Sequence, residues 1–256
     1  MHATIVLLTD FGLADPYVGQ MKGVLRCTAP DACVLDLCHE VSPHNIAQAS
    51  FLLQHSYSYF PRNSIFICVV DPGVGTSRAI IAAEYGDQIF LAPDNGLLSF
   101  LPPESCWWRL HAPSSAISST FHGRDIFAPL AARLACGTPM ACLASRATRS
   151  DISSMQSIPS CILEDSIICQ ILHVDRFGNC LLNISDSMAD QLGDFWRAGS
   201  EHLIRRIKTY AEIGPHEIGL LAGSQGVMEL AMNQCSCSAY LNIQPGQALT
   251  LHRVEP

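Results

Sequence analysis

Charged residues are scarce in this chain, and no region concentrates those of positive sign. Asp, Glu, Lys and Arg make up 15% of its 256 residues, and the net charge is −8. The densest basic cluster, Arg205-Arg206-Ile207-Lys208, is too short to bind a nucleic-acid backbone or an anionic membrane surface. No apolar run reaches the roughly 18 residues that a membrane-spanning helix needs. We therefore expect no nucleic-acid partner and no membrane partner.

Several motifs of common catalytic and cofactor sites are also missing. The sequence has no Gly-x-x-x-x-Gly-Lys-Ser/Thr, so P-loop phosphate chemistry is not expected. No Gly-x-Gly-x-x-Gly follows the first apolar run, which argues against a dinucleotide site. No Gly-x-Ser-x-Gly is present, so a serine of the esterase type has no support.

Cysteine is abundant, but it has no metal-binding spacing. The 12 cysteines include no Cys-x-x-Cys, and Cys235-Ser236-Cys237 has no second pair at a metal-binding distance along the chain. The sequence opens directly into an apolar run, Thr4 to Leu8, so we expect no signal peptide and a cytoplasmic protein with reduced cysteines. No metal site is predicted.

What the chain does have is enough apolar material for a large core, arranged as alternating strands and helices. Of its residues 48% are hydrophobic. The runs Thr4–Leu8, Cys33–Leu37 and Ile65–Val70 read as strands, with apolar residues at helical spacing between them. Short loops in this order predict an α/β domain over residues 1–150 with a largely parallel central sheet.

The pattern changes after that domain. Between Thr138 and Cys161 no apolar period persists, and residues 151–160 are expected to be a linker. Beyond it, short strand-like runs alternate with turn residues, as expected of a small all-β domain, either a barrel or a sandwich, over residues 161–256.

Polar residues gather where the predicted strands end or the predicted helices begin. In a parallel sheet these positions share one edge, so we expect them to converge. The clusters are Asp10 with Asp15, Asp71 with Arg78, Asp94 with Asn95, and His122 with Arg124 and Asp125. Each also has a plain structural explanation, because a carboxylate commonly caps a helix or forms a turn, and a lone histidine is commonly a satisfied loop residue.

Taken together, seven motifs closely resemble one family, the S-adenosyl-methionine (SAM) hydroxide adenosyltransferases, relatives of the SAM-dependent fluorinase and chlorinase. Each motif alone is weak, but the set runs in order through both halves of the chain. The motifs are Thr9-Asp10-Phe11-Gly12 with Asp15, Gln20-Met21-Lys22-Gly23, Val41-Ser42-Pro43-His44, Val70-Asp71-Pro72-Gly73-Val74-Gly75 with Arg78, Ala92-Pro93-Asp94-Asn95-Gly96-Leu97-Leu98, Thr120-Phe121-His122-Gly123-Arg124-Asp125 and Asp175-Arg176-Phe177-Gly178-Asn179.

The resemblance implies an α/β amino-terminal domain, a carboxy-terminal β-barrel and a homotrimer that holds SAM between neighbouring subunits. It implies hydrolysis of SAM to adenosine and L-methionine by water or hydroxide, without a cofactor. The catalytic residues of the family correspond here to Asp71, Arg78 and His122. In the halogenating branch the positions of Asp71, His122 and Gly123 carry other residues, so hydrolysis is the better match.

The resemblance also implies residues that bind the substrate. Asp10 would accept the two ribose hydroxyls, and Asp15 and Asp175 would lie near the methionine ammonium group. Phe177 and Asn179 would form the adenine pocket, and Phe121 would complete the site. Ser224 would bind the methionine carboxylate. The halogenating branch has Arg after that serine and this chain has Gln225, which weakens the last assignment.

Two other functions stay open at the level of sequence. One is a SAM-dependent halide adenosyltransferase of the chlorinase type. The other is a module that binds adenosine or SAM without catalysis. In both cases the same polar clusters would bind the ligand.

Overall fold

The structure is a computed structural model, and it describes residues 3–112, 117–155, 159–199 and 202–254. It divides into two compact units, Met1–Met155 and Gln156–Pro256. The boundary between these units lies within residues 151–160, the segment expected to be a linker. None of the helices formed by the described residues has the length and hydropathy required to cross a bilayer.

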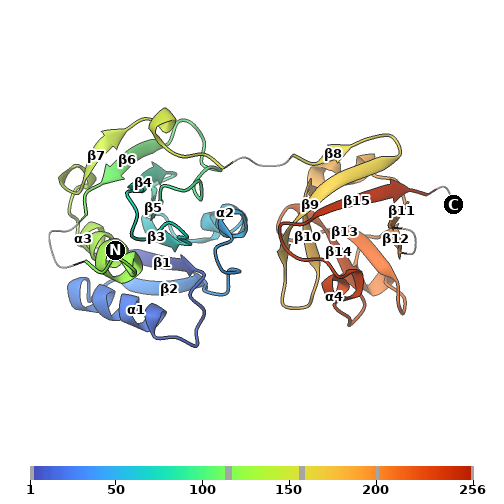
Figure 1. The fold of residues 1–256 in the computed structure, drawn as a ribbon, viewed down its shortest axis with the longest axis horizontal. Coiled ribbons are helices and arrows are strands. Elements are labelled where there is room, and N and C mark those ends of the chain that lie inside the picture. The colour runs from blue at the N-terminus through green and yellow to red at the C-terminus, as the bar shows by residue number, and fades with distance from the viewer. Residues whose placement is uncertain (1–2, 113–116, 156–158, 200–201, 255–256) are drawn as a thin grey trace. The chain divides into compact units, whose positions relative to one another are not determined.

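The amino-terminal unit is a mixed sheet covered by helices on both faces (Figure 1). Its strand order is β2-β1-β3-β5-β4-β6-β7, with parallel pairing from β2 to β5 and antiparallel pairing from β5 to β7. The α/β fold class is thereby confirmed, and the parallel half contains the first three predicted strands. The elements are β1 (Thr4–Thr9), α1 (Tyr17–Thr28), β2 (Cys33–Cys38), α2 (Ile46–Gln54), β3 (Ser64–Val69), β4 (Ile80–Tyr85), β5 (Gln88–Pro93), β6 (Cys106–Leu110), α3 (Ala128–Ala135) and β7 (Ala144–Ala147).

Alternation along the parallel strands divides the core between the two faces of this sheet. In β1 and β3, Ile5 and Ile67 pack with α1 and α3, whereas Val6 and Phe66 pack with α2. Every residue of β3 is buried. Because both faces are covered by helices or loops, these strands read as continuous apolar runs in the sequence.

Two helices begin differently from the sequence-based expectation. Asp15 was expected to cap the helix that follows it, but the N-cap of α1 is Pro16 and no side chain caps that end. The expected helix after His122 begins as one π-helical turn, Gly123–Phe127, and continues as α3. Turns of this kind are rare and often occur at functional sites.

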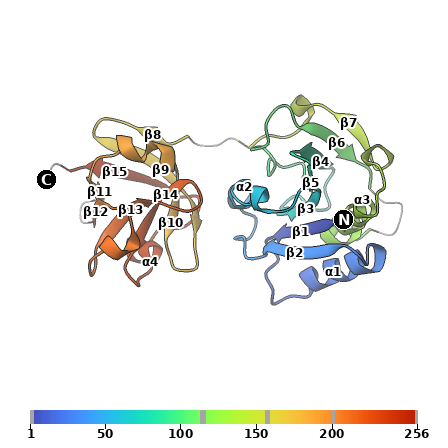
Figure 2. The same cartoon turned by 180° about the vertical axis from the view of Figure 1, so that it is seen from behind.

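The carboxy-terminal unit is a closed β-barrel (Figures 1 and 2). Its strand order is β10-β14-β13-β12-β11-β15-β9-β8, and an additional pairing of β10 with β9 closes the ring. The barrel predicted by the resemblance is confirmed. The elements are β8 (Cys161–Ile162), β9 (Ser166–Val174), β10 (Cys180–Ser185), β11 (Phe195–Ala198), β12 (His202–Arg206), β13 (Ile218–Ala222), β14 (Val227–Met232), α4 (Cys237–Leu241) and β15 (Ala248–Arg253).

Candidate active site

Two neighbouring parallel strands place two carboxylates at the same edge of the amino-terminal sheet. Thr9 at the end of β1 pairs in register with Val69 at the end of β3. Asp10 follows directly after Thr9, and Asp71 comes two residues after Val69. The carboxyl ends of parallel strands are where open α/β sheets bind ligands. A ligand-binding site is therefore expected at this edge of the sheet.

The loop after β3 turns back on itself and brings Arg78 onto Asp71. Gly75 has a φ of +80°, and a side chain there would collide with the carbonyl oxygen of Ser119. Arg78 donates from Nε to Oδ1 of Asp71 over 2.8 Å and from Nη2 to Oδ2 of the same carboxylate. Their side chains are 10% and 5% exposed, respectively. This is a bidentate and nearly buried ion pair, which fixes both partners.

A second loop adds His122 to this pair, although it lies far away in the sequence. His122 precedes the π-helical turn, and its Nδ1 lies 2.8 Å from Nη2 of Arg78. A guanidinium only donates, so Nδ1 must accept and the ring proton of neutral His122 resides on Nε2. Burial and the charge of Arg78 lower the pKa of His122, while Asp71 and Asp125 oppose that shift. His122 is therefore neutral at pH 7.

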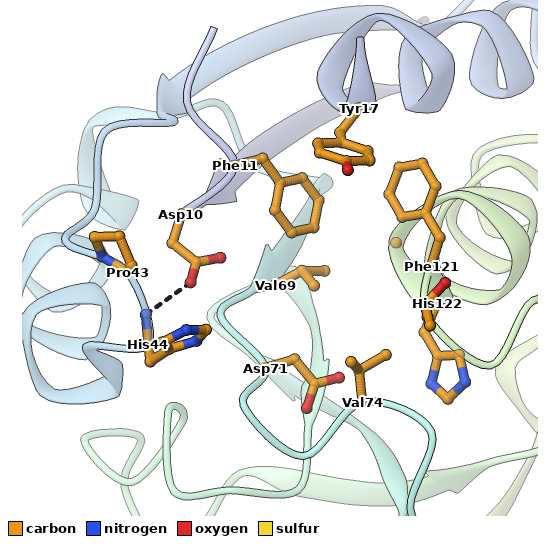
Figure 3. A pocket seen from close by; sticks show the side chains of 12 residues that line it. Asp10, Phe11, Tyr17, Pro43, His44, Val69, Asp71, Val74, Phe121 and His122 are labelled. Atoms are coloured by element: carbon orange, nitrogen blue, oxygen red, sulfur yellow. Dashed lines mark hydrogen bonds between the residues drawn. The ribbon is translucent and has the colours of Figure 1, made fainter. Parts of the chain in front are cut away.

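Asp71 and His122 border a pocket with a cavity volume of about 270 Å³ (Figure 3). Asp10 lies on the opposite wall from His122, and its Oδ2 accepts a hydrogen bond of 2.9 Å from the backbone N–H of His44. His44 has a φ of +66°, which is uncommon for a residue with a side chain. The lining residues are Asp10, Phe11, Tyr17, Pro43, His44, Val69, Asp71, Val74, Thr120, Phe121, His122 and Gly123.

Three aromatic rings form one side of this pocket. Phe121 contacts Tyr17 with ring centroids 5.1 Å apart and Phe11 with centroids 5.7 Å apart, both edge to face. Gly123 packs against this cluster, because a Cβ there would lie 3.2 Å from each of the two phenylalanine rings. The pocket thus combines an apolar side with two carboxylates and a neutral imidazole. Such a combination suits an amphipathic ligand of low molecular weight.

The structure brings together most, but not all, of the predicted residues of the amino-terminal unit. Asp10, Asp71, Phe121 and His122 line the pocket, and Arg78 contacts two of them. Asp15 is exposed and does not line the pocket. The structure therefore gives Asp15 neither the capping role nor a place in this cavity.

The remaining predicted residues belong to two turns of the barrel. Asp175 accepts hydrogen bonds of 2.9 Å from the backbone N–H groups of Phe177 and Asn179 and from the Asn179 side chain, so its carboxylate shapes the turn between β9 and β10. Asn179 is 7% exposed, whereas Phe177 is 78% exposed. Ser224 is exposed in the turn between β13 and β14.

Sequence reasoning missed several pocket residues. Pro43 and His44 belong to one of the seven motifs, but that motif implied no role for either residue. Tyr17 belongs to none of the seven motifs, yet its ring lines the pocket. A positive φ at His44 has no signature in sequence, whereas a histidine directly after the cluster Val41-Ser42-Pro43 was a signal that could have been used.

Comparison with known proteins gives one consistent result for both units. Residues 5–144 match the family model of the SAM hydroxide adenosyltransferase N-terminal domain, and residues 169–250 match that of the C-terminal domain. A Salinispora tropica protein named (R)-S-adenosyl-L-methionine hydrolase is 34% identical over 96% of each chain. A protein named fluorinase from Nocardia brasiliensis is 23% identical over 94% of each chain.

A solved structure agrees with these matches. The crystal structure of an uncharacterized conserved protein from Thermotoga maritima is 32% identical, has a TM-score of 0.88, and covers 97% of this chain and 100% of its own. Matches to both domain models and to a relative above 30% identity over nearly the full length have a single explanation. The chain belongs to the SAM hydroxide adenosyltransferase family.

Proposed function

We propose that this protein hydrolyses SAM to adenosine and L-methionine. One observation carries the proposal: Arg78 joins Asp71 and His122 at the wall of a pocket that Asp10 borders from the other side. The oxygen of a water molecule attacks the ribose C5′, and the bond between C5′ and sulfur breaks. Its electron pair stays on sulfur, which leaves as the thioether of methionine, and the water loses one proton.

The difficult part of this reaction is the nucleophile. A sulfonium leaves as a neutral thioether and needs no acid, whereas water is a weak nucleophile that must be held in line behind C5′. Holding a reactant in such a position can lower a barrier by up to about 7–11 kcal/mol. The trio of Asp71, Arg78 and His122 is suited to that task, because it is rigid and largely buried.

The donors and acceptors of the trio suggest how the roles divide. Nδ1 of His122 is engaged by Arg78, so its Nε2–H is left to donate to the water oxygen. Arg78 donates one N–H to each carboxylate oxygen of Asp71, and each oxygen has a further lone pair that can accept a hydrogen bond. We assign Asp71 as the proton acceptor and His122 as the group that orients the water. The charge of Arg78 favours the hydroxide-like transition state.

The binding groups follow from charge and shape. The Asp10 oxygen that is not bonded to His44 would accept the ribose hydroxyls, and the side formed by Phe11, Tyr17 and Phe121 would contact apolar parts of SAM. Of the barrel residues, Phe177 would stack on adenine and Asn179 would bind its edge. Ser224 would bind the methionine carboxylate, and Asp15 and Asp175 would attract the ammonium group.

We further propose that the reaction uses no cofactor or metal, that the protein is a cytoplasmic homotrimer, and that SAM binds between neighbouring subunits. The chemistry supports the first part, because a sulfonium needs no Lewis acid to leave. The family resemblance supports the trimer. The cavity of about 270 Å³ in the amino-terminal unit is just below the 300–1,000 Å³ usual for such ligands, so we expect further residues to complete the site.

Product analysis in labelled water tests the reaction directly. The protein is incubated with SAM in water enriched in heavy oxygen, and the products are separated by chromatography and weighed by mass spectrometry. We expect adenosine with the label in its 5′-hydroxyl, and unlabelled methionine. Adenosine without label would exclude attack of water at C5′.

Product analysis with added chloride, together with calorimetry, distinguishes hydrolysis from the two alternative functions. With added chloride, a halide adenosyltransferase would yield 5′-chloro-5′-deoxyadenosine in place of adenosine. A binding module would bind SAM in calorimetry, yet adenosine would not accumulate above the level of a buffer control. The identity of 23% to the protein named fluorinase, against 34% to the one named hydrolase, favours hydrolysis.

A further inference from the structure

A chain of four polar side chains runs from the surface to the base of the loop that carries Asp10. Thr9, the last residue of β1, is fully buried, and its hydroxyl lies 2.8 Å from Nδ1 of His39. On the other side of this ring, Nε2 lies 3.0 Å from Oδ1 of Asp36 in β2. The second oxygen of Asp36 lies 2.6 Å from Nζ of Lys22 in α1. Three elements thus meet at one buried histidine.

The protons of this chain can be assigned from its end points. The Thr9 hydroxyl oxygen accepts a hydrogen bond of 3.3 Å from the backbone N–H of Phe11, so its own hydrogen is available to Nδ1 of His39. The ring proton then resides on Nε2, which lies 3.0 Å from Oδ1 of Asp36 but makes no hydrogen bond of good geometry with it. Partial burial favours the protonated carboxyl, but Lys22 and His39 outweigh it and lower the pKa of Asp36. The hydrogen bond with Thr9 orients the imidazole, and the ionised Asp36 attracts its Nε2 edge.

His39 also holds the Asp10 loop through its backbone. Its carbonyl oxygen accepts a hydrogen bond of 2.8 Å from the N–H of Gly12. His39 therefore makes two hydrogen bonds with the loop, one from its ring at Thr9 and one from its carbonyl at Gly12, and Asp10 lies between these two residues. Beyond them, one oxygen of Asp10 is tied to the N–H of His44. Little freedom is left to the Asp10 carboxylate.

The order Thr9, His39 and Asp36 resembles a hydrolytic triad, but these residues are not placed to act as one. Thr9 is 0% and His39 is 4% exposed, and neither lines the pocket. The Thr9 oxygen is already engaged by Phe11 and His39. A nucleophile must reach its substrate, so this chain serves the geometry of the loop.

We propose that His39 is a positioning residue that holds Asp10 in the orientation required to bind the vicinal hydroxyls of a ribose. This inference rests on the proposed function, which gives Asp10 that role. Its consequence is specific. Loss of the imidazole nitrogens should weaken recognition of the diol more than it weakens contacts with the rest of the nucleoside.

The test compares two ligands that differ only in those hydroxyls. The affinities of adenosine and of 2′,3′-dideoxyadenosine are measured by calorimetry on the full chain. We expect the wild type to prefer adenosine by about tenfold or more, since hydrogen bonds to a carboxylate are strong. In His39→Phe, which keeps the ring and removes both nitrogens, the preference should fall to within about threefold of none, as in Asp10→Ala.

Two further variants keep the test decisive. Thr9→Val keeps the branched shape of the buried threonine and replaces its hydroxyl with a methyl group, so it loses the contacts with His39 and with the Phe11 N–H and should reduce the same preference even if His39→Phe does not fold. His111→Phe is the matched control, because this exposed histidine contacts Ser145 and does not line the pocket. It should leave the preference unchanged.

The outcomes separate the inference from the function on which it rests. If the wild type shows no preference for adenosine, Asp10 does not bind the diol, and its binding role fails together with the role of His39, whereas hydrolysis is judged by the labelled products. If the wild type and His111→Phe prefer adenosine and the folded His39→Phe and Thr9→Val variants do so equally, only the role of His39 is overturned. A drop in His39→Phe and Thr9→Val, as in Asp10→Ala, with His111→Phe unchanged, supports it.

Discussion

At the scale of single residues, the guanidinium of Arg78 makes Asp71 and His122 one unit. Replacing Asp71 with Asn keeps the shape and removes the charge and the basicity. We expect Asp71→Asn to lower turnover of SAM by about 10²-fold or more, the usual contribution of a general base. Affinity for SAM should stay within about tenfold, because the proposed role is in the reaction and not in binding.

Steady-state kinetics and calorimetry measure these two quantities. Asp87→Asn is the matched control, since Asp87 is exposed and pairs with Arg62 far from the site. Unchanged turnover in Asp71→Asn would remove this carboxylate from the mechanism.

The charge state of His122 gives a second prediction at this scale. Its pKa is lowered by burial and by Arg78, so the ring is neutral above its ordinary range near 6.5. On acidification through the lowered value, Nδ1 gains a proton and can no longer accept from Arg78. We expect kcat/KM to be flat at neutral pH and to fall with an apparent pKa below about 6.5.

The pH dependence of kcat/KM is measured for the wild type and for His122→Gln, which cannot titrate. The variant should be slower at pH 7 and should lack that acidic limb. An identical limb in both proteins would assign it to another group, and the role of His122 as a neutral donor would be wrong.

The sequence alone predicts most residues of this site, but it does not predict all of the contacts between them. Asp71 and Arg78 share one loop rich in glycine, so their contact is local. The contact of Arg78 with His122 bridges 44 positions and depends on how two loops fold over the sheet edge. His44 and Tyr17 were assigned no role, because a backbone N–H and an edge-on ring leave no mark in a polar motif.

At the scale of elements, the π-helical turn Gly123–Phe127 packs tightly against α1 through Gly123. A Cβ at that position would lie 3.1 Å from Sδ of Met21 and 3.2 Å from the rings of Phe11 and Phe121. Gly23, on the exposed side of α1, has nothing within 4 Å. The two glycines therefore differ in surroundings, although both are helical.

This difference predicts opposite effects of the same substitution. Gly23→Ala should raise the free energy of unfolding by up to about 1 kcal/mol, from helix propensity. Gly123→Ala should lower it by about 1 kcal/mol, because crowding of the aromatic cluster outweighs propensity. Urea denaturation measures the free energy of unfolding of both variants. If Gly123→Ala were as stable as Gly23→Ala, the aromatic cluster would be able to accommodate a methyl group without loss of stability.

In the barrel, β14 carries a buried carboxyl on the face opposite to that of Met228 and Leu230, which pack in the barrel core. Glu229 is 5% exposed, and the hydroxyl of Tyr210 donates to it. Burial raises the pKa of Glu229, the hydrogen bond from Tyr210 opposes that shift, and the charge of Asp175 adds to it. A raised pKa in the folded state means that this group stabilises the fold at low pH and that the contribution is lost as pH rises through the folded value.

We therefore expect Glu229→Gln to gain stability relative to the wild type as the pH rises from about 4.5 towards neutrality. The measurement is the difference in free energy of unfolding between the two proteins at several pH values. The exposed Glu104→Gln serves as control and should show no such trend. A difference independent of pH would mean that the pKa of Glu229 is the same in the folded and unfolded states.

Strands could be predicted from the sequence where burial on both faces produces a continuous run of apolar residues. β1 and β3 are covered on both faces and appear as apolar runs. β7 (Ala144–Ala147) went unrecognised because it is four residues long and only Ala144 is buried. β11 was also missed, since its buried Trp196 and Ala198 alternate with Phe195 and Arg197 over a strand too short to show a period.

At the scale of the whole molecule, the proposed substrate contacts are divided between two units of one chain. The pocket with Asp71 belongs to the amino-terminal unit, whereas Phe177, which is 78% exposed, and Asn179, in a turn shaped by Asp175, belong to the barrel and would complete the proposed site. If SAM binds between neighbouring subunits, as proposed, a complete site takes its two halves from different chains.

Complementation tests this arrangement. The Asp71→Asn variant should be inactive because the half of the site in its amino-terminal unit is damaged. A double variant with Phe177→Ala and Asn179→Ala should be inactive because the half in its barrel is damaged. When the two are co-expressed, mixed trimers should contain some sites with both halves intact, and hydrolysis should reappear. Light scattering should give three times the chain mass of 27.8 kDa. Recovery of activity cannot occur if each site is built from a single chain, so a trimer without complementation would show that both halves come from the same subunit.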